Sequence, residues 1–273
     1  MGGRSVAAGL VGLVLIGGMA TATATPPSHA VGRSHPGALV LMGGGDVPPE
    51  IARRFVELAG GPDGRFVYIP TAAPDAEIDP ARLAAWFRAT FGVRHVTILH
   101  TRDPRVADTA AFAAPLKRAT GVWFGGGRQW RLADAYLDTR VAADLGRVLA
   151  RGDVVGGTSA GASILASFLV RGAPEGNWII DAPGHERGFG LLGRAMVDQH
   201  VNAFHRETDI EDTLKHHPGL LGIGLDEATG ITVIGGQGTV IGLGRVILHD
   251  GRPHGDLPYA VLHRGDRFPL GPP

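Results

Sequence analysis

The chain has 273 residues, of which 44% are hydrophobic and 19% charged, and this balance excludes an intrinsically disordered protein. Its formal net charge is zero and no run of Lys or Arg stands out, so neither a nucleic-acid partner nor a membrane-surface partner is expected. There is no cysteine, which excludes disulfides, thiolate zinc sites and a cysteine nucleophile.

The N-terminal segment, residues 1–24, predicts a signal peptide. Arg4 supplies a positive charge, an apolar run follows from Ser5 to Ala20, and small residues alternate with Thr up to Ala24, as at cleavage sites. The alternative is an uncleaved membrane anchor, but the run is short for a full span and polar residues follow it. We therefore expect cleavage, no membrane attachment afterwards, and a protein secreted to the periplasm or the medium.

After the leader, residues 25–36 are rich in Pro, Ser and His and predict a linker, and residues 37–273 predict a single folded domain. Strands and helices alternate in its first half. Continuous apolar runs, typical of buried parallel strands, occur at residues 38–42, 65–70, 95–99, 121–124 and 154–156. Helical spacing predicts helices at residues 49–59, 80–91, 110–118, 130–137, 139–151 and 162–168. This order predicts an α/β fold with a doubly wound, mostly parallel sheet.

The last third of the chain predicts further strands, which we interpret as antiparallel hairpins laid on the edge of that sheet. They are expected at residues 221–225, 230–234, 239–243 and 246–248. Ligands bind beyond the C-terminal strand ends of such sheets. Three glycine-rich turns follow strands there, at Gly43–Gly45, Gly125–Gly127 and Gly156–Gly157, and each would let a substrate approach the backbone.

Ser159 is the candidate nucleophile. The run from Gly157 to Gly161 matches G-x-S-x-G between a short apolar strand and a predicted helix, the setting of a nucleophile elbow. A sharp turn there exposes the serine Oγ, and glycines are needed two residues to either side because side chains would collide. The helix start would direct free N–H groups at a developing oxyanion. The alternative is a glycine-rich turn that binds phosphate or another ligand.

A serine nucleophile needs a base and an orienting acid. Among the 12 histidines, His200 stands out because it ends the strand-like run that starts at Met196, although a satisfied core histidine is the ordinary alternative. Asp226 and Glu227 both follow an apolar strand, where a carboxylate is costly unless it has a role. The alternative for each is an ordinary charge in a turn.

Four ordered motifs together resemble the cyanophycinase and dipeptidase E family of serine peptidases. They are Gly-Gly-x-x-Gln ending at Gln129, Gly-Thr-Ser-Ala-Gly-Ala around Ser159, Asp-Gln-His ending at His200, and Gly-Ile-Gly-Leu-Asp-Glu-x-Thr around Glu227. The resemblance extends from Ala38 to about Asp250. It implies a three-layer α/β sandwich like that of class I glutamine amidotransferases, with Ser in place of Cys at the elbow.

The resemblance also implies roles for single residues. It implies a Ser159–His200–Glu227 triad that acts through an acyl-enzyme. The oxyanion hole would combine the Ala160 N–H with that of Gly126 or Gly127. The residues that match substrate-binding positions of the family are Gln129, Asp198, Gln199 and Arg206. No metal or organic cofactor is implied.

The chain departs from the family at the substrate side. Arg128 stands where the family usually has Asp or Asn. Cyanophycinases carry arginines after the Asp-Gln-His motif that grip an Asp-backbone polymer decorated with Arg, whereas here Phe204 and Asp209 occupy two of those positions and only Arg206 keeps the arginine. Because an Arg fork is what binds carboxylates bidentately, this loss argues against cyanophycin as the substrate while leaving the triad intact.

We therefore expect a secreted serine peptidase that cleaves peptide or isopeptide bonds, β-aspartyl bonds included, in a peptide or polymer substrate. A non-catalytic peptide-binding module on the same scaffold is the alternative from another class. An esterase or acyltransferase would use the same triad, since water and another acceptor meet the same acyl-enzyme. The sequence leaves a homodimer open.

Overall fold

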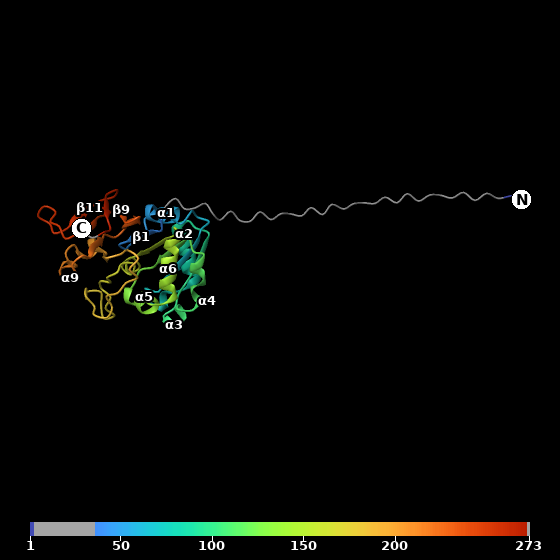
Figure 1. Ribbon diagram of the computed structural model, residues 1–273, viewed down its shortest axis with the longest axis horizontal. Helices are drawn as coiled ribbons and strands as arrows, with labels where there is room; N and C mark the ends of the chain where they lie inside the picture. The colour runs from blue at the N-terminus through green and yellow to red at the C-terminus, as the bar shows by residue number, and fades with distance from the viewer. Residues whose placement is uncertain (3–35, 272–273) are drawn as a thin grey trace. The chain divides into compact units, whose positions relative to one another are not determined.

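A computed structural model describes residues 1–2 and 36–271, and residues 36–271 belong to one compact unit (Figure 1). Residues 3–24 of the predicted signal peptide and residues 25–35 of the predicted linker lie outside the described residues. The twelve strands of this described part are β1 (Ala38–Met42), β2 (Arg65–Ile69), β3 (His95–Ile98), β4 (Gly121–Phe124), β5 (Val154–Thr158), β6 (Ala195–Gln199), β7 (Leu221–Leu225), β8 (Thr229–Ile234), β9 (Gln237–Gly242), β10 (Val246–His249), β11 (Ala260–Leu262) and β12 (Arg267–Pro269).

Helices connect most of the parallel strands. The α-helices among the described residues are α1 (Pro49–Leu58), α2 (Pro80–Phe91), α3 (Pro104–Ala107), α4 (Ala110–Ala113), α5 (Gln129–Tyr136), α6 (Arg140–Ala150), α7 (Ala160–Ser163), α8 (Val201–Phe204) and α9 (Glu211–His216). Proline at the start of α1 and α2 fits a position where no backbone N–H is required. At the start of α2 the Asp79 side chain also accepts bonds from two free N–H groups.

Two sheets organise the fold. The eight-stranded sheet has the order β12-β9-β8-β1-β5-β4-β2-β3, and its five strands from β1 to β3 in that order are parallel. The four-stranded sheet has the order β11-β10-β7-β6, with β6 and β7 parallel. The expected α/β fold with a mostly parallel sheet and additional antiparallel strands is therefore confirmed.

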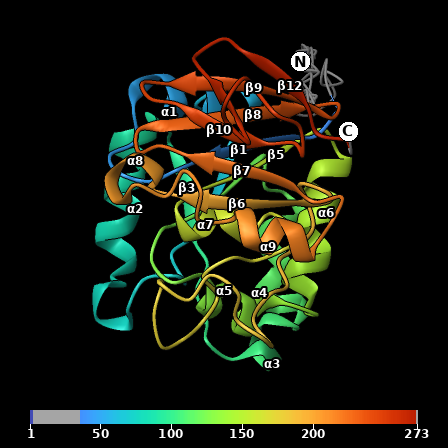
Figure 2. The ribbon, with the colours of Figure 1, turned by 90° about the vertical axis from the view of Figure 1, so that its left-hand side faces the viewer.

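The central strands of the large sheet, β8, β1, β5 and β4, are buried on both faces, as continuous apolar strands require. Along β1, Leu39 and Leu41 pack into a core with α5, α6 and the four-stranded sheet, whereas Val40 and Met42 pack into a second core with α1 and α2. In Figure 2, α2 and α6 accordingly lie on opposite sides of the strands. This layering places the C-terminal ends of β1, β4 and β5 at one edge, next to those of β6 and β7.

Two expectations differ from the structure in detail. The C-terminal strands do not all extend the edge of the large sheet: β8, β9 and β12 do, but in the second sheet β10 pairs with β7 and β11 pairs with β10. The helix expected over residues 162–168 ends at Ser163. The N–H groups of Ser167 and Phe168 donate to the Ala195 carbonyl at the start of β6 instead, so a tertiary contact replaces the helical bonds.

Candidate active site

Ser159 lies in a strained turn between β5 and α7. Its backbone has φ 53° and ψ −120°, a conformation that residues with a Cβ rarely adopt. The turn is held because the Ser159 N–H donates to the Met42 carbonyl at 2.9 Å. This fixed backbone conformation sets the direction of the serine side chain.

The glycines on either side of Ser159 are required by close backbone contacts. A Cβ at Gly157 would overlap the Gly161 carbonyl, and a Cβ at Gly161 would overlap the Phe124 carbonyl of β4. The collision expected from the sequence is thus real. It arises within the turn at Gly157 and against a neighbouring strand at Gly161.

Ser159, His200 and Glu227 form one hydrogen-bonded chain. The Ser159 Oγ lies 2.8 Å from the His200 Nε2, and the His200 Nδ1 lies 2.6 Å from the Glu227 Oε1. The three residues follow β5, β6 and β7, so segments distant in the sequence meet at the C-terminal strand ends. With Nδ1 protonated, the ring donates to the carboxylate and leaves Nε2 free to accept the serine proton.

The Gly43–Gly45 turn after β1 gives the histidine and the glutamate their room. A Cβ at Gly44 would overlap the His200 ring, and one at Gly45 would lie 3.3 Å from the Glu227 Oε2. The Gly43 carbonyl also accepts from the His200 N–H at 2.9 Å. This turn therefore makes space for His200 and Glu227, whereas the sequence suggested space for a substrate.

Asp226 and Glu227 have different surroundings although they are adjacent. Asp226 is 2% exposed, and its Oδ2 accepts from the Arg245 backbone N–H at 2.8 Å and from the Arg245 Nε at 3.0 Å. The Glu227 N–H instead donates to the Asn202 side chain at 2.8 Å, while its carboxylate meets His200. Of the two acids, Glu227, which the family resemblance implies, is the one that contacts the histidine.

The predicted oxyanion-hole residues lie beside the serine. Ala160 follows it directly and begins α7, and no hydrogen bond from its N–H is found among residues 36–271. A Cβ at Gly126 would lie 3.4 Å from the Ser159 Cβ, so this turn passes close to the reactive atom. Gly127 has φ 136° and faces the Ala72 carbonyl on its other side.

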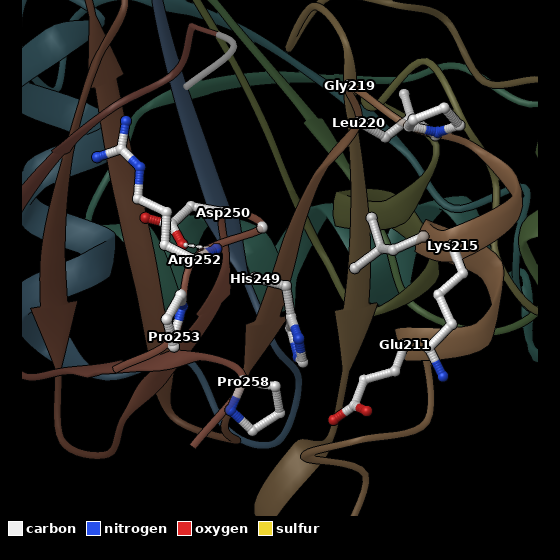
Figure 3. A pocket seen from close by; sticks show the side chains of 12 residues that line it. Glu211, Lys215, Gly219, Leu220, His249, Asp250, Arg252, Pro253 and Pro258 are labelled. Atoms are coloured by element: carbon white, nitrogen blue, oxygen red, sulfur yellow. Dashed lines mark hydrogen bonds between the residues drawn. The ribbon is translucent and has the colours of Figure 1, made fainter. Parts of the chain in front are cut away.

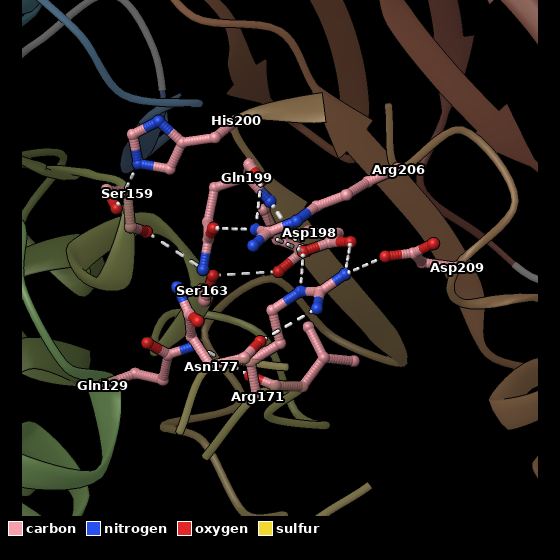
Figure 4. Close-up of polar contacts among 12 residues, drawn as sticks. Gln129, Ser159, Ser163, Arg171, Asn177, Asp198, Gln199, His200, Arg206 and Asp209 are labelled. Atoms are coloured by element: carbon pink, nitrogen blue, oxygen red, sulfur yellow. Dashed lines mark hydrogen bonds and ion pairs between the residues drawn. The ribbon is translucent and has the colours of Figure 1, made fainter. Parts of the chain in front are cut away.

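The four residues predicted to bind substrate are nearly buried, with exposed fractions of 7% or less. Gln129 donates from its side chain to the Val170 carbonyl at 2.8 Å. The Gln199 Oε1 accepts from Arg206 at 3.1 Å. The Arg206 side chain also reaches the Gln199 carbonyl at 3.0 Å. These side chains form a polar layer behind the triad (Figure 4).

Arg171 is the centre of this layer, and the sequence analysis did not identify it. Its Nε and Nη2 each donate to one Asp198 oxygen at 2.8 Å, and Nη2 also reaches Asp209 at 2.6 Å (Figure 4). Burial lowers the pKa of Arg171, but hydrogen bonds and charge from the two carboxylates outweigh it and raise that pKa overall. The one available signal was an isolated arginine directly after the apolar run that ends at Val170.

Arg128, the unusual residue beside the glycine turn, is half-buried and donates to the Ala173 carbonyl. Its buried Nε has no hydrogen-bond partner among the described residues. Burial, and then the nearby positive charge of Arg131, lower the pKa of Arg128. The structure therefore places an incompletely paired cation in the segment that follows Gly126 and Gly127.

A cavity of about 490 Å³ lies apart from the triad residues, between α9 and the segment after β10 (Figure 3). Its walls include Leu214, Leu220 and Pro258, with His249 and Glu211 among the polar groups. Within residues 1–2 and 36–271 there is no cluster of three or more His, Cys, Asp or Glu side chains suited to a metal ion. The same residues contain no helix that is long and apolar enough to cross a membrane.

Known proteins similar to this chain are peptidases. A sequence profile of peptidase family S51 matches residues 39–241. The cyanophycinase of Synechococcus elongatus is 32% identical over 231 residues, which cover 80% of this chain and 69% of that protein. The cyanophycinase of Geminocystis herdmanii is 27% identical over 242 residues, with 80% and 87% covered.

Solved structures give a consistent result. A peptidase from an acI-B1 actinobacterium superimposes with a TM-score of 0.67 at 25% identity, covering 86% of this chain and 97% of that one. A putative peptidase E protein from Listeria monocytogenes has a TM-score of 0.56 at 17% identity, covering 76% and 99%. The second likeness concerns the fold alone.

Proposed function

Because this chain belongs to peptidase family S51 and is a serine-type peptidase, we propose that it hydrolyses peptide or isopeptide bonds through a Ser159–His200–Glu227 triad. Membership confirms the resemblance drawn from the four motifs. The observation that carries the proposed roles is the continuous chain of hydrogen bonds, 2.8 Å and 2.6 Å long, that joins the three side chains. β-Aspartyl dipeptides are the first substrates to test.

The distances support a two-step reaction. The Ser159 Oγ attacks the scissile carbonyl carbon while its proton passes to the His200 Nε2. When the tetrahedral intermediate collapses, the carbon–nitrogen bond breaks and His200 gives the proton to the leaving amine. The Glu227 carboxylate accepts from the His200 Nδ1 throughout and stabilises the imidazolium. Water then attacks the acyl-enzyme by the reverse sequence of proton transfers.

The oxyanion is proposed to bind between Ala160 and the glycine turn. The Ser159 N–H is already used by the Met42 carbonyl, so the next N–H along the chain, that of Ala160, is the better donor. Gly126 approaches the serine most closely of the turn glycines and supplies the second N–H, with Gly127 as the alternative. A single oxyanion donor contributes roughly 10²–10³ in rate in other serine hydrolases.

An activity-based fluorophosphonate probe tests the nucleophile. We expect one covalent adduct per chain, mapped by mass spectrometry to Ser159, because only this serine has its Oγ within hydrogen-bond reach of a histidine in the described part of the chain. Ser163, four residues on, is an internal control because its Oγ donates to the Val197 carbonyl. An unlabelled, folded protein would favour the peptide-binding module instead.

We further propose that the mature protein is exported, from the leader pattern of residues 1–24. The test measures the cellular compartment and the N-terminal residue of the fluorophosphonate-labelled protein. In a bacterial host it should appear in the periplasm or the medium, with an N-terminus after Ala22 or Ala24. Labelled protein that stays in the cytoplasm and retains Met1 would contradict export without affecting the proposed triad.

Gly44→Ala should lower kcat/KM by roughly 10²-fold, because the new Cβ would overlap the His200 ring and move the base from the serine. Gly61→Ala is the matched control. Gly61 also has positive φ, +100° against +122° at Gly44, but nothing lies within 4 Å of its added Cβ. The control should lose stability through backbone strain while keeping kcat/KM. Equal losses of kcat/KM in both variants would show that strain alone is responsible.

A further inference from the structure

We infer that the leaving residue of the substrate carries an apolar side chain that packs on Phe204, and that arginine is disfavoured at this position. The inference rests on the proposed function, because His200 hands its proton to the leaving amine and so faces the leaving residue. Phe204 closes α8 four residues after His200. Its ring centroid lies 5.9 Å from that of His200, with the ring planes at 76°.

Phe204 has an unusual environment for a phenylalanine, since 59% of it is exposed. Single exposed apolar residues are common on proteins, so exposure by itself indicates nothing. The position is what matters, because the ring stands beside the base that serves the leaving group. An apolar side chain bound there would remove both surfaces from water.

One face of the Phe204 ring is already covered. The Arg206 guanidinium carbon lies 4.6 Å from the ring centroid, a cation–π contact, and Arg206 is only 7% exposed. Arg206 thereby orients the ring. Its positive charge beneath the ring disfavours a second cation at the open face.

The two carboxylates that would suit a cationic substrate side chain, Asp198 and Asp209, are balanced in charge by Arg171 and Arg206. Asp198 is 1% exposed and paired through both oxygens with Arg171, and Asp209 accepts from the same guanidinium. Arg171 itself is 2% exposed. An arginine of the substrate would have to displace this buried arginine to reach Asp198, because a guanidinium of the chain itself already occupies that site.

The experiment compares β-aspartyl-leucine with β-aspartyl-arginine as substrates. Leucinamide and argininamide are compared in parallel as agents that protect Ser159 from the fluorophosphonate probe. We expect kcat/KM to favour the leucine dipeptide by about tenfold or more, within the range of hydrophobic discrimination in other enzymes. Leucinamide should protect at a lower concentration than argininamide. The protection assay reports on the site even if neither dipeptide is turned over.

Phe204→Ala should reduce the leucine preference to about twofold or less, mainly through a higher KM for the leucine dipeptide. Val106→Ala is the matched control, since Val106 is 41% exposed on another four-residue helix, α3, and should leave the ratio unchanged. An arginine preference, or a leucine preference that survives Phe204→Ala, overturns the inference. Absence of probe labelling would instead contradict the proposed function.

Discussion

Ser159→Ala is expected to lower kcat by at least roughly 10³-fold and to abolish fluorophosphonate labelling. Removing the Oγ leaves His200 without a partner to activate, whereas substrate contacts and oxyanion donors remain, so KM should change little. The fold should be retained, because alanine meets the same backbone strain at φ 53° and the turn keeps its bond to the Met42 carbonyl. Steady-state kinetics and a thermal melt measure the two effects.

Ser163→Ala is the matched control for that variant. It makes the same chemical change four residues away in α7, where the hydroxyl donates to the Val197 carbonyl at 2.9 Å. Losing this buried bond should cost about 1–3 kcal/mol of unfolding free energy, with kcat near the wild-type value. Near-wild-type hydrolysis by Ser159→Ala would remove the serine from the mechanism.

Glu227→Gln should lower kcat by roughly 10³-fold. A neutral amide can still contact the His200 Nδ1, but it stabilises the imidazolium less and can select the wrong ring tautomer. Because Glu227 is 37% exposed and does not anchor the fold, the melting temperature should change little. Measuring kcat beside thermal stability separates the two contributions.

Asp226→Asn makes the same change at the neighbouring carboxylate and is expected to give the opposite pattern. Asp226 is buried and bonded to Arg245, so the variant should lose about 1–3 kcal/mol of unfolding free energy while keeping most of its kcat. If Asp226→Asn lost activity and Glu227→Gln kept it, the orienting role would move to Asp226.

The fold was predictable where the signal is local. Runs such as residues 38–42 and 121–124 are apolar throughout because both faces of the large sheet are covered, and each of them is a buried strand. The division of the last strands between two sheets was not predictable. Residues 239–243 and 246–248 follow each other closely and have similar patterns, yet one extends the large sheet and the other pairs with β7. Pairing between distant strands leaves no periodicity in the sequence.

The candidate site likewise contains residues that the local sequence predicts and residues that depend on distant contacts. The nucleophile elbow was predictable because the turn leaves no room for a Cβ at two positions close to Ser159, which are both glycines in G-x-S-x-G. Arg171 was missed, since its role depends on Asp198, 27 positions away, and on Asp209, 38 positions away. The packing of the exposed Phe204 ring on the buried Arg206 guanidinium was not predictable either. Two residues this close in the sequence give no sign of which side chain is exposed and which is covered.

By itself, the sequence determined that Ser159 lies in a strained turn between a strand and a helix, within an α/β chain of peptidase family S51. Those features are local, or are carried by ordered motifs. The family resemblance implied Glu227, and the tertiary structure showed that Glu227 and not Asp226 meets His200. Only the tertiary structure decided that Arg171 pairs with the buried Asp198 behind the site. The physical reason is that direction, burial and charge pairing arise where separate strand ends converge, and spacing along the chain does not encode them.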